Sequence, residues 1–205
     1  ADQMWQYPPL AGPVFVLGAW LPGDRLGFVT LFLGFDAAIM AMLTSQARRT
    51  ARRGGTRLWA LLPLVVGPLL LARFDVVPTA FAVAAVLMAA RPVASGALAA
   101  AGAWVKVWPL LVLTALRRRD LPRGVAGALA ASAVIAGVLV VTSEDPLSFL
   151  GGQRDRGLQI ESLAAWPFLI ARLLGAPVEV VYRYGAHEVD ASGVDMVARS
   201  VILFD

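Results

Sequence analysis

Long apolar runs recur from one end of the chain to the other and constrain its fold more than any other feature. Of the 205 residues, 59% are hydrophobic and 16% are charged, whereas a soluble domain is about half apolar and a quarter charged. The runs Leu26–Thr44 and Gly124–Thr142, of about nineteen residues each, are long enough to cross a bilayer as helices. The sequence therefore predicts an all-α, polytopic transmembrane helical bundle that forms one membrane-embedded domain over residues 1–205.

Residue usage excludes several other classes of protein. Cysteine is absent, so there are no disulfides and no thiolate metal sites, and a single histidine makes a histidine-based site improbable. We expect neither a metal ion nor a cofactor. The net charge of +4 does not predict nucleic-acid binding, because no basic face with interleaved aromatic residues accompanies it.

Arginines gather in two short stretches, which sets the expected orientation. Residues 48–57 hold five arginines and no acid, and residues 117–123 hold four arginines with Asp120 as the only acid. Cytoplasmic loops carry an excess of basic residues, so both stretches are expected in the cytoplasm. Residues 143–195 hold eight acids and four arginines, and we expect residues 143–193 to form an extracytoplasmic loop region.

The chain has one lysine, Lys106, and it lies between apolar runs. An ionisable group at membrane depth marks a functional site by default. Residues 58–72 span only about 22 Å as a helix, less than the roughly 30 Å hydrocarbon core, so Arg73 and Asp75 are expected to be recessed. Polar backbone at that depth requires burial in protein or a water-filled cavity, which here would open to the outside.

The segment Val93–Leu116 is predicted to form a re-entrant hairpin of two short helices, because it must return to the second arginine stretch too soon to cross a bilayer. Its bend is expected at Trp108-Pro109, since proline disfavours helix in the residue before it. Lys106 would then lie near the height of Arg73. We expect a short helix over residues 163–174 and a hairpin within Val178–Val189, where apolar residues alternate around a glycine.

A recessed cavity with cations and carboxylates suits chemistry on an anionic, lipid-linked substrate. Arginine offers phosphate a bidentate fork, and lysine offers a compact charge. We predict that Arg73, Lys106 and His187 bind a donor phosphate. We also predict that Asp75 and Glu161 serve catalysis by orienting these cations or the sugar.

Simpler roles remain open for each residue. Arg73 and Asp75 could pair with each other, and Lys106 could extend to the membrane interface. His187 could be a structural hydrogen-bonding residue, and Glu161 could pair with a nearby arginine. Asp36, near the middle of the first long run, is expected to be satisfied by a neighbouring helix or to face a wet cavity.

Five short strings occur in a fixed order along nearly the whole chain. They are Tyr7-Pro8-Pro9-Leu10-Ala11, Arg73-Phe74-Asp75-Val76-Val77-Pro78, Gly102 with Lys106-Val107-Trp108-Pro109, Arg156-Gly157-Leu158-Gln159-Ile160-Glu161-Ser162, and Tyr184-Gly185-Ala186-His187-Glu188-Val189. Together they resemble glycosyltransferase family 87, integral-membrane enzymes of the GT-C type that include polyprenol-phosphate-mannose-dependent mannosyltransferases of actinobacteria.

This resemblance implies a hexosyltransferase at the plasma membrane. It would move a sugar, mannose, from a polyprenyl-phosphate donor to a glycolipid or polysaccharide acceptor on the outer face, with inversion. Within the strings, we place Tyr7, Arg156 and Gln159 along the substrate cavity. Such enzymes resemble one another in placing an aspartate base before the Tyr-Pro-Pro string, so we expect that base upstream of Ala1, with Asp2 as an alternative; both ends of the chain are expected to be truncated.

Two other classes fit the same composition. A transporter of lipid-linked or anionic substrates would also use broken helices and buried charges, and it predicts internal pseudo-symmetry. We find no convincing repeat between the halves of the sequence. A non-catalytic membrane assembly subunit is the third class, and it predicts no binding of polyprenyl phosphate.

Overall fold

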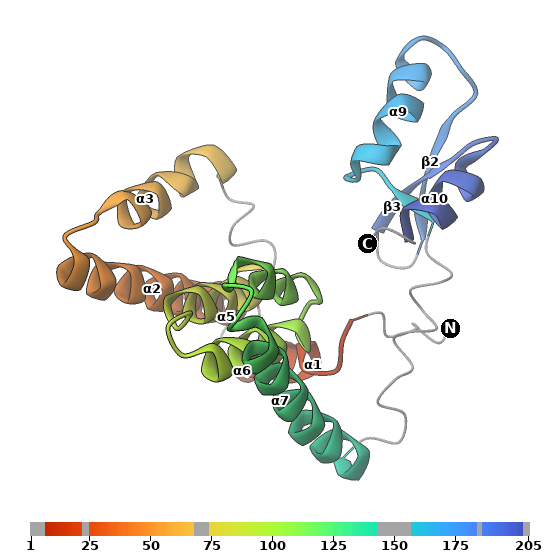
Figure 1. The fold of residues 1–205 in the computed structure, drawn as a ribbon. Helices are drawn as coiled ribbons and strands as arrows, with labels where there is room; N and C mark the ends of the chain where they lie inside the picture. The colour runs from red at the N-terminus through yellow and green to blue at the C-terminus, as the bar shows by residue number, and fades with distance from the viewer. Residues whose placement is uncertain (1–6, 22–24, 68–73, 143–156, 184–185, 203–205) are drawn as a thin grey trace. The chain divides into compact units, whose positions relative to one another are not determined.

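A computed structural model describes residues 7–21, 25–67, 74–142, 157–183 and 186–202 (Figure 1). The chain divides into two units, which are described separately. The helical unit comprises Tyr7–Pro146, and the sheet unit comprises Ala1–Gln6 and Leu147–Asp205.

Two helices of the helical unit are long and apolar enough to cross a membrane. Helix α2 is Arg25–Thr50 and helix α7 is Leu121–Thr142. Their 26 and 22 residues give lengths of about 39 and 33 Å at 1.5 Å per residue, which exceeds the roughly 30 Å hydrocarbon core. Both predicted spans are confirmed. Helix α2 continues beyond Thr44 because alanine, glutamine and arginine, which follow there, all favour helix.

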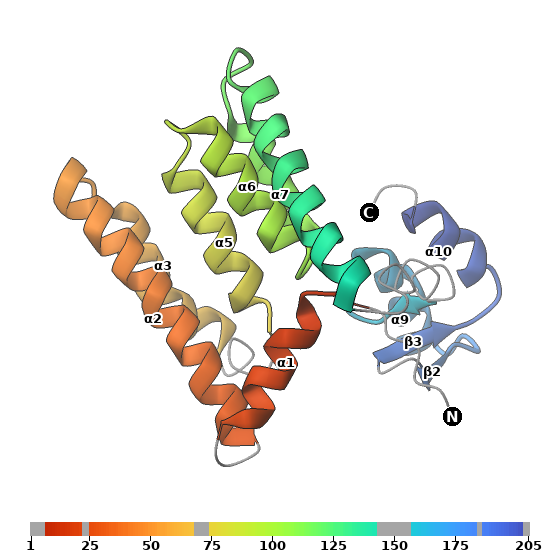
Figure 2. The ribbon, with the colours of Figure 1, turned by 90° about the horizontal axis from the view of Figure 1, so that it is seen from below.

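The other helices of this unit are shorter. Helices α5, Val76–Leu87, and α6, Pro92–Ala103, have 12 residues each, or about 18 Å, and lie side by side (Figure 2). The remaining elements are α1, Ala11–Trp20, α3, Gly54–Val66, and the 3-10 helix η1, Trp108–Ala115. The two short helices predicted over Val93–Leu116 correspond to α6 and η1, which pack against each other. Their re-entrant placement in the membrane stays a prediction.

The bend after α6 differs from the sequence prediction. The chain turns at Trp104–Val107, and Trp108-Pro109 begin η1 instead of marking the bend. Proline is well tolerated in the first turn of a helix, because its missing N–H has no partner to lose there.

Close packing holds α6 between α5 and α7. A Cβ atom at Gly96 would overlap the carbonyl oxygen of Gly124, and one at Gly127 would overlap that of Val93. On the other side, the buried Ser95 hydroxyl donates to the carbonyl of Ala85 on α5 at 2.8 Å. Small residues thus bring the helix backbones together, as expected for packing within a membrane.

Asp36, within α2, accepts a hydrogen bond from the indole Nε1 of Trp59 on α3 at 2.8 Å. A half-buried carboxylate is costly without a partner. The expectation that a neighbouring helix satisfies Asp36 is therefore confirmed, and the bond joins α3 to α2.

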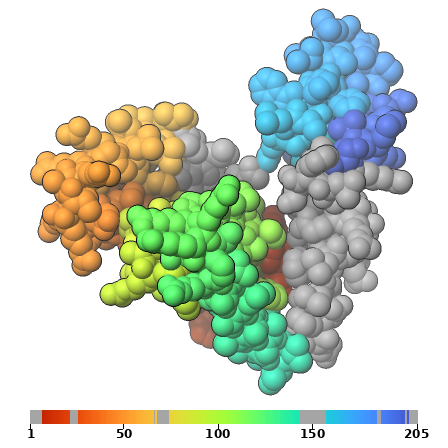
Figure 3. Space-filling model, in the orientation of Figure 1, coloured from red at the N-terminus to blue at the C-terminus, as the bar shows by residue number. Residues whose placement is uncertain are grey.

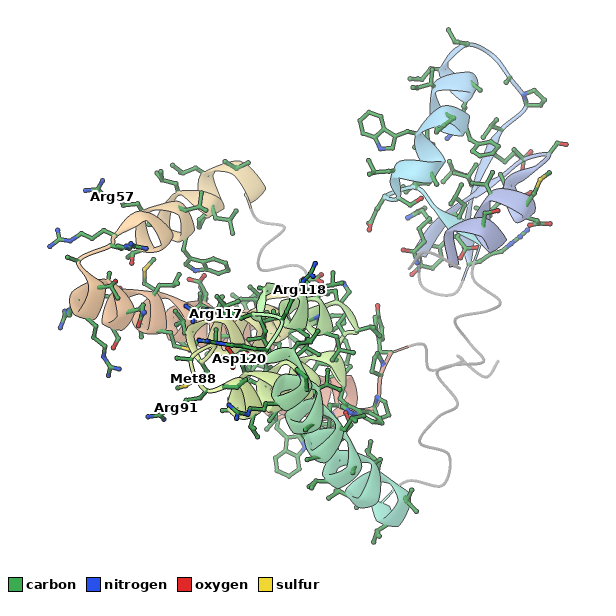
Figure 4. The ribbon with its side chains drawn as sticks, in the orientation of Figure 1. Arg57, Met88, Arg91, Arg117, Arg118 and Asp120 are labelled. Atoms are coloured by element: carbon green, nitrogen blue, oxygen red, sulfur yellow. The ribbon has the colours of Figure 1, made fainter. Side chains whose placement is uncertain are left out.

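The arginine-bearing connections of the helical unit share one end. Figure 2 shows the α2–α3, α5–α6 and η1–α7 connections toward the same end, and Arg49 and Arg91 line one cavity there. Figure 4 labels Arg57 in the first turns of α3, Arg91 in the α5–α6 connection, and Arg117 and Arg118 in the η1–α7 connection. We call this the arginine end. The start of α5 and the turn after α6 lie at the other end of their helices.

The sheet unit is a small mixed structure. Strands β1, Leu158–Gln159, β2, Glu179–Arg183, and β3, Ala186–Asp190, form an antiparallel sheet in the order β1-β3-β2. Its core contains Leu158 and Val189 from the sheet, packed with residues of η2, Leu163–Ala165, α9, Trp166–Leu173, and α10, Val194–Ile202. The predicted hairpin and short helix are confirmed, whereas strand β1 was not predicted.

Gly96→Ala should lower the stability of the helical unit by about 1–3 kcal/mol, because the added methyl must push the α7 backbone away from α6. Gly137→Ala on α7 is the matched control, since a Cβ there meets nothing within 4 Å. The control should be neutral or stabilising by up to about 1 kcal/mol. Thermal unfolding of the purified protein measures both, and equal melting temperatures would contradict the packing argument.

Candidate functional site

Lys106 lies in the turn that follows α6. Its backbone N–H donates to the carbonyl of Gly102 at 2.9 Å. A Cβ at Gly102 would lie 2.8 Å from Cβ of Phe81 and 3.0 Å from Cβ of Pro109. Only glycine lets α6 end this close to α5 and η1, and this contact fixes the position of the turn.

Asp75 immediately precedes α5 and faces that turn. Its backbone carbonyl accepts hydrogen bonds from the Thr79 N–H at 3.1 Å and the Thr79 hydroxyl at 2.6 Å. Nζ of Lys106 donates a hydrogen bond to Oδ1 of Asp75. The side chains are 36% and 38% exposed, respectively, and an ion pair this exposed contributes at most about 1 kcal/mol to stability. Its main effect is to position the two charges.

A cluster of aromatic rings lies on one side of this ion pair, with Phe74 next to Lys106. Nζ of Lys106 lies 5.5 Å from the ring centroid of Phe74, within the range of a cation–π interaction. Tyr7 meets Phe74 edge to face, with ring centroids 5.0 Å apart, and Phe15 lies 5.4 Å from Phe74. The lysine therefore has a carboxylate and a ring face as neighbours.

The segment that carries Tyr7 is fixed to the same turn. The backbone N–H of Leu10 donates to the carbonyl of Trp104 at 3.1 Å. Three stretches that are distant in sequence thus converge at the pair: the residues before α1, the start of α5 and the turn after α6. We call Tyr7, Phe74, Asp75 and Lys106 the lysine site.

The lysine site has the chemistry to receive an anion. Among the described residues, the Lys106 ammonium has Asp75 as its only hydrogen-bond partner. An ammonium carries three N–H donors, so two remain for a ligand. An oxyanion such as phosphate could bind there while Asp75 holds the ammonium in place.

The sheet unit contains a second group of polar residues. Glu188 on β3 is only 3% exposed, and its Oε1 accepts a hydrogen bond from the Gly157 N–H at 3.2 Å. A Cβ at Gly157 would lie 2.7 Å from Oε2 of Glu188. The ring of His187, on β3, packs edge to face against Tyr182, its cross-strand partner on β2, with ring centroids 5.0 Å apart. Both rings are exposed.

The structure brings three predicted site residues together: Tyr7, Asp75 and Lys106. The other described ones, Gln159, Glu161 and His187, lie in the sheet unit, where Gln159 pairs with Glu188 across the sheet and Glu161 is exposed. Arg73, Arg156 and Asp2 lie outside the described residues. The functional roles assigned to all these residues stay predictions.

Two residues of these groups had no predicted role. Phe74 belongs to the Arg73-Phe74-Asp75 string. Its position between two predicted site residues, Arg73 and Asp75, was the sequence signal that could have indicated a place in the site. Glu188 belongs to the last string, but a glutamate in a stretch that alternates between apolar and polar residues is expected to face solvent. Its burial depends on strand β1, which the sequence did not predict. Within the described residues, no group of three or more His, Asp or Glu side chains could hold a metal ion.

The helical unit has two membrane-length apolar helices, with short paired helices between them and a charged site at the ends of the short helices. These features are typical of a helical membrane protein. The family model of glycosyltransferase family 87 matches residues 5–198, and the chain belongs to this family of GT-C membrane glycosyltransferases. Searches of curated proteins and of solved structures found no match. The predicted family and fold class are confirmed.

Glu188→Ala should destabilise the sheet unit by about 1–3 kcal/mol, because it leaves the Gly157 N–H without its acceptor. Glu188→Gln should cost less than about 1 kcal/mol, since the amide oxygen still accepts the bond and no charge is buried. Hydrogen exchange of the β1 and β3 amides measures the loss. Exposed Glu179, replaced by alanine, is the control, and a loss as large as that of Glu188→Ala would contradict a specific role.

Proposed function

We propose that this protein transfers mannose from a polyprenyl-phosphate donor to a hydroxyl of a glycolipid or polysaccharide, with inversion at the sugar. Membership of the family supports glycosyl transfer. The observation that supports a polyprenyl-phosphate donor most strongly is the Lys106–Asp75 pair. Its half-exposed ammonium lies at one end of an apolar helical unit. A lipid-linked phosphate needs both a cation and an apolar surface beside it.

The reaction develops negative charge on the leaving phosphate. The acceptor oxygen attacks the anomeric carbon, the bond from that carbon to the phosphate oxygen breaks, and the electron pair leaves with the polyprenyl phosphate. A fixed ammonium favours this charge, and such electrostatic stabilisation is usually a large part of catalysis. Lys106 takes this role, with Arg73 and His187 as further donor-phosphate ligands.

Carboxylates have two roles in this mechanism: they orient the cations or the sugar, and one of them accepts the acceptor proton. Asp75 orients the Lys106 ammonium, as their hydrogen bond indicates. Glu161 orients a cation or the sugar, and Tyr7, Arg156 and Gln159 line the substrate cavity. The acceptor proton passes to a carboxylate base, for which an aspartate before Tyr7 is expected.

The charge distribution supports an orientation for the site. The positive-inside rule places the arginine end in the cytoplasm. Asp75 precedes α5 and Lys106 follows α6, whereas Arg91 connects these two helices. The lysine site thus belongs to the opposite end, and we propose that it opens on the outer side of the plasma membrane.

Lys106→Ala should lower kcat for mannose transfer by about 10²–10³-fold, because the leaving phosphate loses its fixed cation. The assay uses radiolabelled polyprenyl-phosphate mannose with the protein reconstituted in lipid. Arg118→Ala, an exposed arginine at the arginine end, is the matched control for loss of one positive charge. It should stay within about twofold of the native rate, since surface substitutions rarely matter.

Other outcomes would separate the alternatives. Equal transfer by the Lys106→Ala variant would remove this lysine from the site. Donor binding without transfer by the native protein would point to another sugar or acceptor. Absence of donor binding would favour a transporter of another substrate or an assembly subunit.

A further inference from the structure

A cavity of about 750 Å³ lies at the corner between α2 and α3, away from the lysine site. Its lining includes three arginines, Arg48, Arg53 and Arg57, together with Thr56. We call these four residues the arginine corner. Helices α2 and α3, orange in Figure 3, reach the surface of the face shown there.

No carboxylate balances these arginines. Within the described chain, none of the three guanidinium groups forms an ion pair, and the lining contains no acidic residue. Arg48, Arg53 and Arg57 are all exposed, so solvent screens their mutual repulsion but leaves the three cations accessible. The cavity therefore favours a negatively charged occupant.

Thr56 belongs to the wall of the same cavity. The hydroxyl oxygen of Thr56 is buried and has no hydrogen-bond partner in the described structure. Thr56 lines this cavity and also the adjoining one, of about 510 Å³, which contains Arg52. Because this oxygen is buried, Thr56 shapes the wall of the cavity and leaves ligand contacts to the exposed arginines.

Phosphate is the anion that fits best. A guanidinium presents parallel N–H donors that match two phosphate oxygens, and arginine is a preferred residue for phosphate recognition. Phosphate could reach the corner as a lipid headgroup or as a free ion.

The helix that follows favours a lipid. Leu58, Leu61 and Leu64 of α3 are 71%, 56% and 81% exposed. They continue directly from the arginine corner along the helix, so a headgroup on the arginines would leave acyl chains beside these leucines. Basic pockets between membrane helices bind anionic headgroups in this way. We propose that the arginine corner is a binding site for the phosphate headgroup of an anionic phospholipid.

The second arginine stretch provides a matched comparison. Nε of Arg119 lies 3.8 Å from Oδ2 of Asp120 in the η1–α7 connection, so part of its charge is balanced locally. Arg117, Arg118 and Arg123 are exposed. Removing these three charges changes the net charge as much as removing those of the arginine corner.

The test measures lipid retention by the purified protein in detergent, using native mass spectrometry. Phosphatidylglycerol, phosphatidylcholine with the same acyl chains, and inorganic phosphate are added separately. Phosphatidylglycerol should be retained at least tenfold more strongly than phosphatidylcholine. The combined variant Arg48→Gln, Arg53→Gln, Arg57→Gln should abolish this preference, and Arg117→Gln, Arg118→Gln, Arg123→Gln should preserve it.

Three results would overturn the proposal. Equal loss in both triple variants would show attraction to net charge alone, and equal retention of the two lipids would show no headgroup site. Inorganic phosphate that displaces phosphatidylglycerol at similar concentrations would assign the corner to the free ion. Melting temperatures without lipid check the fold, and if the triple variant does not fold, Arg53→Gln alone should still weaken the preference at least threefold.

Discussion

The position of Lys106 depends on how closely α6 packs between α5 and α7. Gly96 and Gly127 let the α6 and α7 backbones meet, and Gly102 lets the end of α6 approach Phe81 and Pro109. Larger side chains at these positions would separate the helices. The turn that carries Lys106 would then move away from Asp75. The runs of small residues are therefore part of the architecture of the site, even though none of them has a reactive group.

The helical unit uses its basic residues in two different ways. At the start of α5, one lysine is held by one carboxylate and one aromatic ring, so its charge is placed accurately. At the α2–α3 corner, three arginines share a cavity without a carboxylate, so their charge is available to an external anion. Placement of a single charge suits a reacting phosphate, whereas accumulated charge suits binding of an anionic lipid headgroup.

Local sequence was sufficient for the elements whose signal is local. The two long apolar runs gave α2 and α7, and alternation around a glycine gave the β2–β3 hairpin. The bend after α6 was misplaced because proline both disfavours helix before it and starts helices well, and tertiary packing decides between the two. Strand β1 has only two residues and exists through its pairing with β3, which no local pattern indicates.

The candidate site was predictable to a similar extent. Lys106 stood out as the only lysine among apolar runs, and Asp75 stood out as a charge that a short helix leaves recessed. The two residues are thirty-one positions apart, and their contact depends on the packing of α6. The sequence therefore predicted that they lie at a similar depth in the membrane, but it did not predict their ion pair. The burial of Glu188 was equally hidden, since the Gly157 N–H comes from the residue before β1, which is distant in sequence.

Two aspartates of the helical unit show why the lysine site, and not another buried charge, is the better functional candidate. Asp36 accepts its hydrogen bond from the neutral indole of Trp59, within the contact of α2 with α3. That arrangement satisfies a carboxylate and presents no cation to a ligand. Asp75 instead holds an ammonium that is 36% exposed, and an ion pair of this exposure adds little stability. The pair contributes little to folding, yet three distant segments converge around it, which makes the lysine site the better candidate for binding a ligand.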